Sequence, residues 1–103
     1  MAQSPYPQNI GKVGKVVDNG ITRPFLIEDE IMRPETGNPE KVIYLQKIRY
    51  EDNHAVYFRL AYYIIGKKPK MRGKWVFGQY ATMFPAEDLA YIIGEMTRRD
   101  WKL

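Results

Sequence analysis

The residues best suited to bind an anion form one short stretch of the chain, Lys67-Lys68-Pro69-Lys70-Met71-Arg72-Gly73-Lys74. It holds five of the sixteen Lys and Arg residues and none of the twelve Asp and Glu, so it contributes +5 to a net charge of +4. The rest of the chain is therefore close to neutral. Aromatic pairs flank the stretch, Tyr62-Tyr63 before it and Trp75 and Phe77 after it. Cations neutralise phosphates and flat rings stack on bases, so this pattern is typical of a surface for single-stranded nucleic acid. The alternative is a tight connection between two strands that lysines keep soluble and unpaired.

Length and composition limit the chain to one domain. Its 103 residues suffice for a single core and are too few for two. The absence of cysteine excludes disulfides and thiolate metal sites and favours a reducing compartment. Apolar runs reach about five residues, against the roughly twenty of a membrane-spanning helix, and no secretory signal precedes them. We expect a cytoplasmic protein without membrane contact, with residues 1–9 as a disordered lead and residues 10–103 as a single domain.

Turn residues predict a hairpin in the first part of the chain. Residues 11–18 and 21–28 flank Asp18-Asn19-Gly20, which tolerates the positive φ of a tight turn. Residues 28–40 then combine acidic side chains with Pro34 and Pro39. Because proline cannot donate within a central strand, we expect an exposed acidic loop there. Its carboxylates could hold a hard cation, although a solvated connection is the simpler interpretation.

Residues 41–50 and 55–65 alternate as a second pair of strands around a turn at residues 51–54. The first strand places one set of side chains on one face, Val42, Tyr44, Ile48 and Tyr50, and a second set on the other, Ile43, Leu45, Lys47 and Arg49. The second strand has an apolar face that we expect to be core, Val56, Phe58, Leu60, Tyr62 and Ile64, and an opposite face of Tyr57, Arg59, Ala61, Tyr63 and Ile65. In the simplest register, Lys47 and Arg49 share a face with Tyr57, Arg59 and Tyr63 and extend one basic aromatic surface. A second core or a dimer interface is the alternative interpretation of that surface.

The last part of the chain predicts a strand and then a helix. In residues 75–81, Trp75 and Phe77 face one way, and Val76 and Tyr80 face the other. A helix begins after Pro85, with Glu87 and Asp88 in its first turn and apolar residues at helical spacing, Leu89, Ile92, Ile93 and Met96. Arg98 and Arg99 suit the helix dipole at its end, and Trp101 packs the tail on the domain. The prediction is an α+β fold, an antiparallel sheet of four to five strands in hairpins or a meander, covered on one face by a single C-terminal helix.

Residue types give little support for catalysis. His54 is the only histidine and lies in a polar turn, where a turn-forming role is favoured over a catalytic one. Sites built from Cys and His are excluded by count, which leaves carboxylates for a hard cation, Asp18, Glu28, Asp29 and Glu30. No lysine follows Glu28 at the spacing of paired-carboxylate nucleases. We expect no enzyme activity, no catalytic residue, no metal and no cofactor. An enzyme that uses the acidic loop remains a third hypothesis, and it predicts cation binding lost on Glu28→Gln or Glu30→Gln.

The order of features from Ile48 onward is an aromatic strand pair, a basic loop containing Lys-Pro, a short strand and a helix opened by Pro85-Ala86-Glu87. This order resembles the single-stranded-DNA-binding coactivator family known as positive cofactor four, in which two chains pair through the helix. The counterparts here are Phe58-Arg59 with Tyr62-Tyr63, then Lys67-Lys68-Pro69-Lys70 and Gly73-Lys74. The similarity covers about half of the chain, and the hairpin at residues 11–28 and the bulky strand Trp75-Val76-Phe77 depart from it. The resemblance implies a homodimer that binds unpaired strands with little sequence preference.

We therefore expect a small protein that binds single-stranded DNA or RNA. The residues expected to contact phosphates are Lys67, Lys68, Lys70, Arg72 and Lys74, extended by Lys47, Arg49 and Arg59, and those expected to stack on bases are Tyr57, Tyr63 and Trp75. The alternative is a homo-oligomeric assembly module in which the rings form an interface and the lysines surround it. An open groove beside the rings would favour nucleic acid, whereas burial of the rings between chains would favour assembly.

Overall fold

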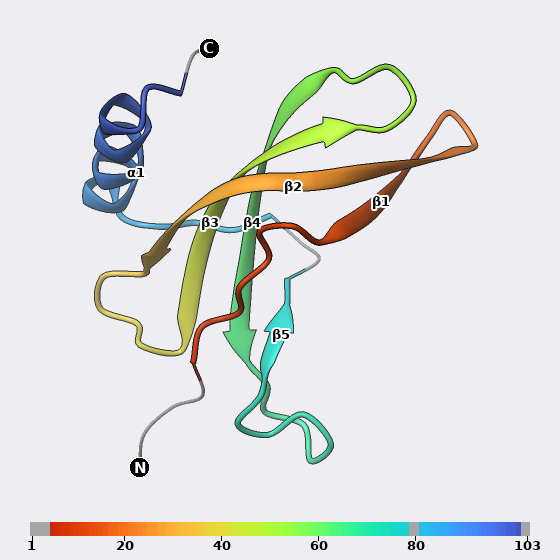
Figure 1. Ribbon diagram of the computed structural model, residues 1–103. Helices are drawn as coiled ribbons and strands as arrows, with labels where there is room; N and C mark the ends of the chain where they lie inside the picture. The colour runs from red at the N-terminus through yellow and green to blue at the C-terminus, as the bar shows by residue number, and fades with distance from the viewer. Residues whose placement is uncertain (1–4, 79–80, 102–103) are drawn as a thin grey trace.

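A computed structural model of the protein describes residues 5–78 and 81–101. Its elements follow the order β1 (Val13–Asp18), β2 (Ile21–Pro34), β3 (Lys41–Tyr50), β4 (Val56–Ile65), β5 (Trp75–Phe77) and α1 (Ala86–Arg98). The strands form one antiparallel sheet in the order β1-β2-β3-β4-β5, so each strand pairs with its neighbours in sequence (Figure 1). The sheet is curled like half of a barrel. The predicted α+β fold with a single C-terminal helix is confirmed.

The first hairpin follows the predicted turn chemistry. Asn19 and Gly20 both have positive φ, 50° and 76°, and Asp18 pairs with Ile21. The prediction of an exposed acidic loop from residue 28 was wrong, because β2 continues to Pro34. A bulge between Ile27 and Asp29 shifts the register, after which β2 stays paired with β3. Pro34 ends the strand, where a missing donor is tolerated, and the loop shrinks to residues 35–40.

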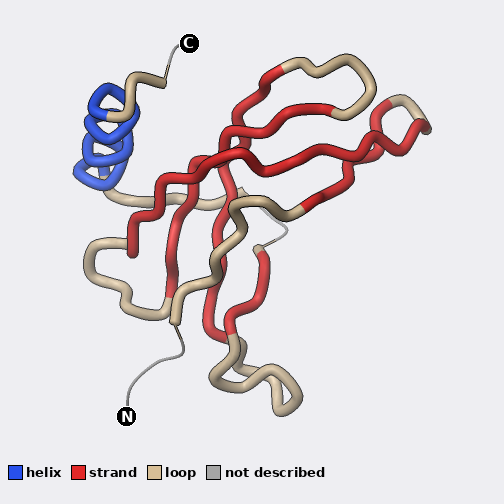
Figure 2. Tube along the Cα trace, in the orientation of Figure 1, coloured by secondary structure: helices blue, strands red, loops and turns tan. Residues whose placement is uncertain are grey.

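The two faces of the sheet carry separate clusters. The inner face, defined by the even-numbered residues of β3 and the odd-numbered residues of β4, buries two groups, Phe25, Ile27, Ile48 and Tyr50 in one and Val42, Tyr44 and Ala61 in the other. On the outer face, Ile31 and Ile43 pack with Ile92 of α1. No helix of the described residues covers this face. The sheet curls around it (Figure 2), and Tyr6 of the N-terminal segment packs against the cluster of Val42, Tyr44 and Ala61.

The N-terminal strap, residues 5–12, crosses the inner face (Figure 1). The Tyr44 hydroxyl donates to the carbonyl of Pro7 over 2.7 Å, and the Gly11 amide donates to the carbonyl of Ile27 over 2.8 Å. The ring of Tyr6 lies 5.3 Å from that of Trp75 between centroids. Residues 5–9, which the sequence placed in a disordered lead, are instead held against the sheet; residues 1–4 lie outside the described residues.

The helix covers β2 and β3 and leaves β4 uncovered. It begins after Pro85 as predicted, and Ile92 is buried. Trp101 folds back as predicted, stacking on Phe58 at 5.8 Å and donating its indole N–H to Asp29 over 3.1 Å. The predicted core face of β4 was wrong, because Leu60 is 50% exposed and Ile64 is exposed with it. The predicted apolar face of α1 is also only partly buried, since Leu89 is exposed and Ile93 is 52% exposed.

The predicted strand at residues 75–81 is confirmed only for Trp75–Phe77. Trp75 pairs with Ile65 and Phe77 pairs with Tyr63, which places both rings on the inner face. Tyr80, expected on the opposite face, lies outside the described residues. This short strand brings the end of the basic loop next to the inner face.

Candidate nucleic-acid interface

The basic loop, residues 67–74, projects from the sheet between β4 and β5 (Figure 1). Backbone bonds make it compact: Met71 N donates to Lys68 O over 2.9 Å and Lys74 N to Met71 O over 3.0 Å. At its base, Gly66 N donates to Lys74 O over 2.9 Å. A Cβ on Gly66 would lie 2.4 Å from the carbonyl oxygen of Met71, so only glycine fits this close approach. The loop therefore holds its cations in a defined arrangement.

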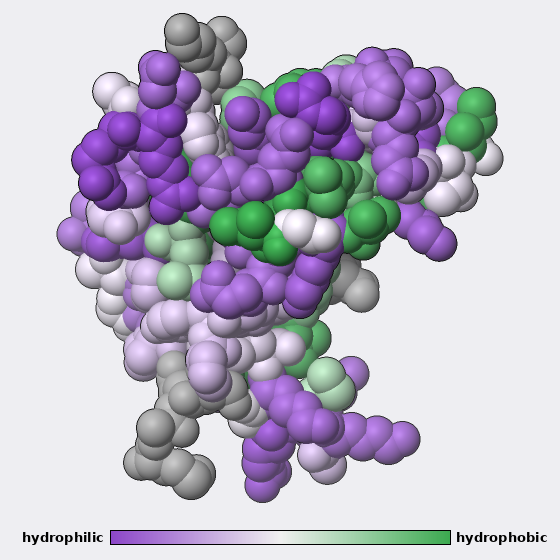
Figure 3. Space-filling view, in the orientation of Figure 1, coloured by the Kyte–Doolittle hydropathy of each residue, from purple (hydrophilic) through white to green (hydrophobic). Residues whose placement is uncertain are grey.

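Four of the five cations of the basic loop have no acidic partner among the residues that the structure describes, namely Lys68, Lys70, Arg72 and Lys74. The fifth, Lys67, pairs with Glu40, with 2.5 Å between Nζ and Oε1. All five side chains are exposed. Figure 3 shows hydrophilic side chains projecting from this end of the molecule. The loop is thus a concentrated positive charge that is free to meet an anion.

The prediction that Lys47 and Arg49 join Tyr57, Arg59 and Tyr63 on one face was wrong. Lys47 pairs with Phe58 and Arg49 with Val56, so the two cations lie on the outer face. The cause is the length of the turn. With four residues between Tyr50 and Ala55, each odd-numbered residue of β3 pairs with an even-numbered residue of β4. Arg49 is also neutralised, because its Nε lies 2.7 Å from Oε2 of Glu28. Neither residue extends the inner face.

The three rings predicted to stack on bases differ in their accessibility. Tyr63 donates its hydroxyl to Asn9 over 3.2 Å and packs between Tyr44 and Phe77, and Trp75 lies against Tyr6. Both are partly buried beneath the N-terminal strap. Tyr57 is exposed, with its edge against Tyr50 at 4.9 Å. Phe77 is exposed as well and was missing from the predicted site, although its alternation with Trp75 had placed it on the same face. Tyr57 and Phe77 are therefore the rings that a ligand can reach.

Arg59 lies between these exposed rings on the inner face. Its guanidinium carbon is 5.0 Å from the ring centroid of Phe25 and 5.3 Å from that of Phe77. Its Nε donates to Oε1 of Gln46 over 2.8 Å, and within residues 5–78 and 81–101 it has no ion-pair partner. Burial lowers the pKa of Arg59, and electrostatic interactions with Tyr63 and Glu30 oppose this shift. Arginine stays protonated across the physiological range, so the group is a half-buried cation with a neutral partner.

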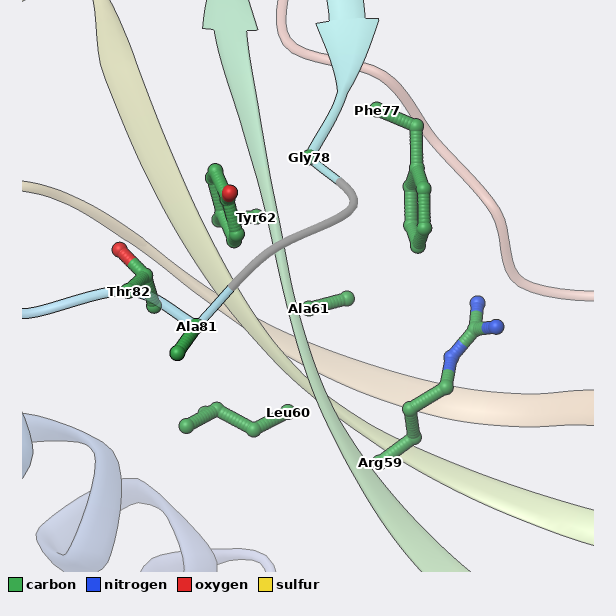
Figure 4. Close-up of a pocket in the computed structure, with 8 residues that line it drawn as sticks. All are labelled: Arg59, Leu60, Ala61, Tyr62, Phe77, Gly78, Ala81 and Thr82. Carbon is green, nitrogen blue, oxygen red and sulfur yellow. The ribbon is translucent and has the colours of Figure 1, made fainter.

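A cavity of about 450 Å³ opens beside Arg59, lined by Arg59, Leu60, Ala61, Tyr62, Phe77, Gly78, Ala81 and Thr82. Figure 4 shows the guanidinium directed toward Phe77 on one side of it, with Tyr62 and Thr82 on the other. This volume lies within the range of small-ligand pockets. The cavity thus offers a cation and an aromatic ring to the same ligand.

The carboxylates considered for a metal are engaged elsewhere. Asp18 pairs with Arg23, Glu28 with Arg49, and Asp29 with Arg99. The described part of the chain has no group of three His, Cys, Asp or Glu side chains suited to a metal ion. His54 has φ of 59° in its turn, the conformation that a turn-forming role requires. None of the helical residues described here forms a span long and apolar enough to cross a membrane.

Comparisons of the chain with protein-family models, curated proteins and solved structures gave no significant match. The resemblance to the positive cofactor four family stays a prediction. The functional argument therefore depends on the geometry of the basic loop and of the inner face.

Proposed function

We propose that this protein binds single-stranded nucleic acid along β4, β5 and the basic loop. The observation that carries the proposal is the unpaired charge of the loop, four exposed cations without an acidic partner in the described structure. Such charge gives affinity for phosphates without sequence preference. The neighbouring rings of Phe77 and Tyr57 supply stacking surfaces, and Arg59 lies between them.

On the inner face, strand β4 is long enough to contact several nucleotides. From Ile65, where the loop begins, to Tyr57 the strand β4 spans about 26 Å at about 3.3 Å per residue. Phe77, Arg59 and Tyr57 follow one another along this path. Stacking on these rings needs an open base face, which a duplex does not offer, so the arrangement favours unpaired strands. Each stacked ring should contribute about 1–3 kcal/mol to binding.

The proposed contacts revise the residues expected from the sequence. Lys68, Lys70, Arg72 and Lys74 contact phosphates, and Lys67 contributes less because Glu40 partly compensates it. Arg59 and Tyr57 keep their expected roles, and Phe77 joins them. Tyr63 and Trp75 support the surface from beneath, whereas Lys47 and Arg49 lie on the outer face and take no part.

The test is fluorescence anisotropy of a labelled thymidine oligonucleotide, and of a duplex of equal length, across a salt series. The Lys68→Gln/Lys70→Gln variant should lower the slope of log K against log salt by about 1.4, because each phosphate contact on a single strand contributes about 0.7. Lys12→Gln/Lys15→Gln removes the same charge from exposed residues at the other edge of the sheet and should keep the slope. Absence of single-strand binding at low salt, or equal losses in both variants, would contradict the proposal.

A second candidate function is assembly of two copies through the outer face. Exposed apolar side chains gather on that side, Leu60 and Ile64 on β4 and Leu89 and Ile93 on α1. Exposed apolar side chains that lie together can form an interaction site. A homodimer formed there would leave the inner faces and both basic loops open, so assembly and nucleic-acid binding are compatible. Light scattering of the purified chain tests this candidate.

A further inference from the structure

A chain of hydrogen bonds crosses the inner face from the N-terminal strap to Arg59. Asn9 donates to Glu30 from its backbone N over 2.9 Å and from Nδ2 over 3.2 Å. Gln46 Nε2 donates to Oε1 of Glu30 over 2.9 Å, and Arg59 Nε donates to Oε1 of Gln46 over 2.8 Å. Glu30 is 6% exposed and Gln46 is 0% exposed. Buried polar side chains are costly unless they are satisfied, and here each is satisfied by the next.

The chemistry of the two ends determines how the Gln46 amide points. An ionised carboxylate only accepts hydrogen bonds and a guanidinium only donates them. Gln46 must therefore turn its NH₂ group toward Glu30 and its oxygen toward Arg59. The opposite orientation would set two donors against each other at Arg59 and two acceptors at Glu30. Glu30 thus determines, through Gln46, where the Nε edge of Arg59 is held.

The guanidinium of Arg59 is held on three sides. The rings of Phe25 and Phe77 lie near it at 5.0 Å and 5.3 Å, and Gln46 holds its Nε edge. A guanidinium has five N–H donors in a planar fork, and the contact with Gln46 uses one of them. The contact is also neutral, so no carboxylate binds the guanidinium directly, in contrast to Arg49, which faces Glu28. A fixed fork of this kind matches two oxygens of one phosphate, and its preorganisation reduces the entropy lost on binding.

We propose that Glu30 and Gln46 are positioning residues that aim Arg59 as a bidentate phosphate-binding fork beside the cavity. The ring of Phe77, in the same cavity, then receives the base attached to that phosphate. This inference rests on the proposed function for the source of the phosphate, which is there a single-stranded nucleic acid. A free nucleotide has the same phosphate and base and could bind in the same way. Glu30 touches no ligand in this arrangement and acts only through Gln46.

The test uses three variants of the full chain. Gln46→Glu, made in a Glu30→Gln background so that two buried carboxylates do not face each other, has nearly the same shape and places a carboxylate on Arg59, which should neutralise the fork. Lys15→Gln in the same background is its control, since it changes the net charge by the same amount at an exposed residue of β1. Arg59→Lys keeps the charge and loses the fork. Circular dichroism checks that each variant folds.

Two measurements read the result. In the salt series with the thymidine oligonucleotide, Gln46→Glu and Arg59→Lys should each weaken binding about 10- to 100-fold, the usual loss for a hydrogen-bonded charge contact. Gln46→Glu should also lower the salt slope by about 0.7, whereas Lys15→Gln should not. In NMR spectra, the Arg59 Nε–H signal should shift on addition of deoxythymidine 5′-monophosphate to the parent protein and stay unchanged in Gln46→Glu.

The outcomes separate this inference from the proposed function. One outcome is that the parent binds the oligonucleotide, that Gln46→Glu and Lys15→Gln bind it with equal affinity, and that the Arg59 Nε–H signal of the parent does not shift with the mononucleotide. In that case the fork is refuted and the proposed function stands. If no oligonucleotide binds but the mononucleotide shifts the Arg59 signal, the fork is supported and the proposed function fails. If neither ligand has an effect, both are refuted. Should Gln46→Glu not fold, full affinity in Arg59→Lys together with an unmoved Arg59 signal in the parent refutes the fork.

Discussion

Replacing Asp88 by alanine should release the first turn of α1 from the sheet. The Asp88 carboxylate is 0% exposed and accepts three hydrogen bonds. Oδ1 accepts hydrogen bonds from Arg33 Nε over 2.9 Å and from Thr36 Oγ1 over 2.6 Å, and Oδ2 accepts one from Thr36 N over 2.9 Å. Arg33 is at the end of β2 and Thr36 is in the loop after it. These three hydrogen bonds, called here the Asp88 clasp, therefore determine where α1 lies on the outer face.

The magnitude follows from the burial of the two charged partners. Removing one partner of a buried ion pair costs about 3–5 kcal/mol. The side chain of Arg33 is 28% exposed, so water can rehydrate it in the variant, and we take the lower end, about 3 kcal/mol. Domains of this size have a free energy of unfolding of about 5–15 kcal/mol, so the loss is a large share of it. The Tm should fall by about 12 °C, at about 4 °C per kcal/mol.

Urea denaturation followed by circular dichroism measures the effect. Glu87→Ala is the control, because Glu87 lies in the same first turn but is exposed. It should cost only the interaction with the helix dipole, about 0.3–1 kcal/mol. If Asp88→Ala is no more destabilising than Glu87→Ala, the clasp does not hold the helix and the reasoning is refuted.

The same clasp predicts a pH dependence. Burial alone would raise the pKa of Asp88, but the hydrogen bonds from Thr36 and Arg33 outweigh it and lower the pKa below its usual value. A carboxyl group with a depressed pKa in the folded state stabilises the fold above its unfolded pKa of about 3.9, and this stability is lost as the pH falls through the folded pKa. The difference between the parent and Asp88→Ala should therefore be largest near neutral pH and shrink below about pH 4. A constant difference down to pH 3 would contradict this.

Three further changes test the loop, its base and the outer face. Glu40→Gln frees Lys67 and should strengthen single-strand binding by no more than about five-fold, since exposed ion pairs contribute up to about 1 kcal/mol; weaker binding would argue against a phosphate role for Lys67. Gly66→Ala should destabilise the protein by about 1–3 kcal/mol in urea, because its Cβ would lie 2.4 Å from Met71 O, whereas Gly94→Ala, with nothing within 4 Å, should stabilise α1. Ile93→Glu should shift a homodimer toward monomer in light scattering, while Tyr91→Glu, which is exposed on the opposite side of α1, should not. A monomeric parent would remove the assembly candidate.

The elements that the sequence determined by itself depend on local chemistry. Asn19 and Gly20 specify the first turn, Pro85 and the acidic residues after it specify the start of α1, and the charge of residues 67–74 is a matter of composition. Each of these signals acts over a few residues, and the tertiary contacts of the fold agree with it. The α+β fold and the projecting basic loop follow from them.

The arrangement of the candidate site was decided only by the tertiary structure. Side chains alternate across a strand with period two, so the pairing register across the 51–54 turn, one residue away from the expected one, places Lys47 and Arg49 on the outer face. A bulge and a paired neighbour kept β2 extended through residues that look like a loop, which buried Glu30. Asn9 of the strap and Gln46 then met Glu30 from 21 and 16 positions away along the chain, and Arg59 met Gln46 from 13 positions away. Such contacts arise from the curl and register of the whole sheet, and no local pattern encodes them.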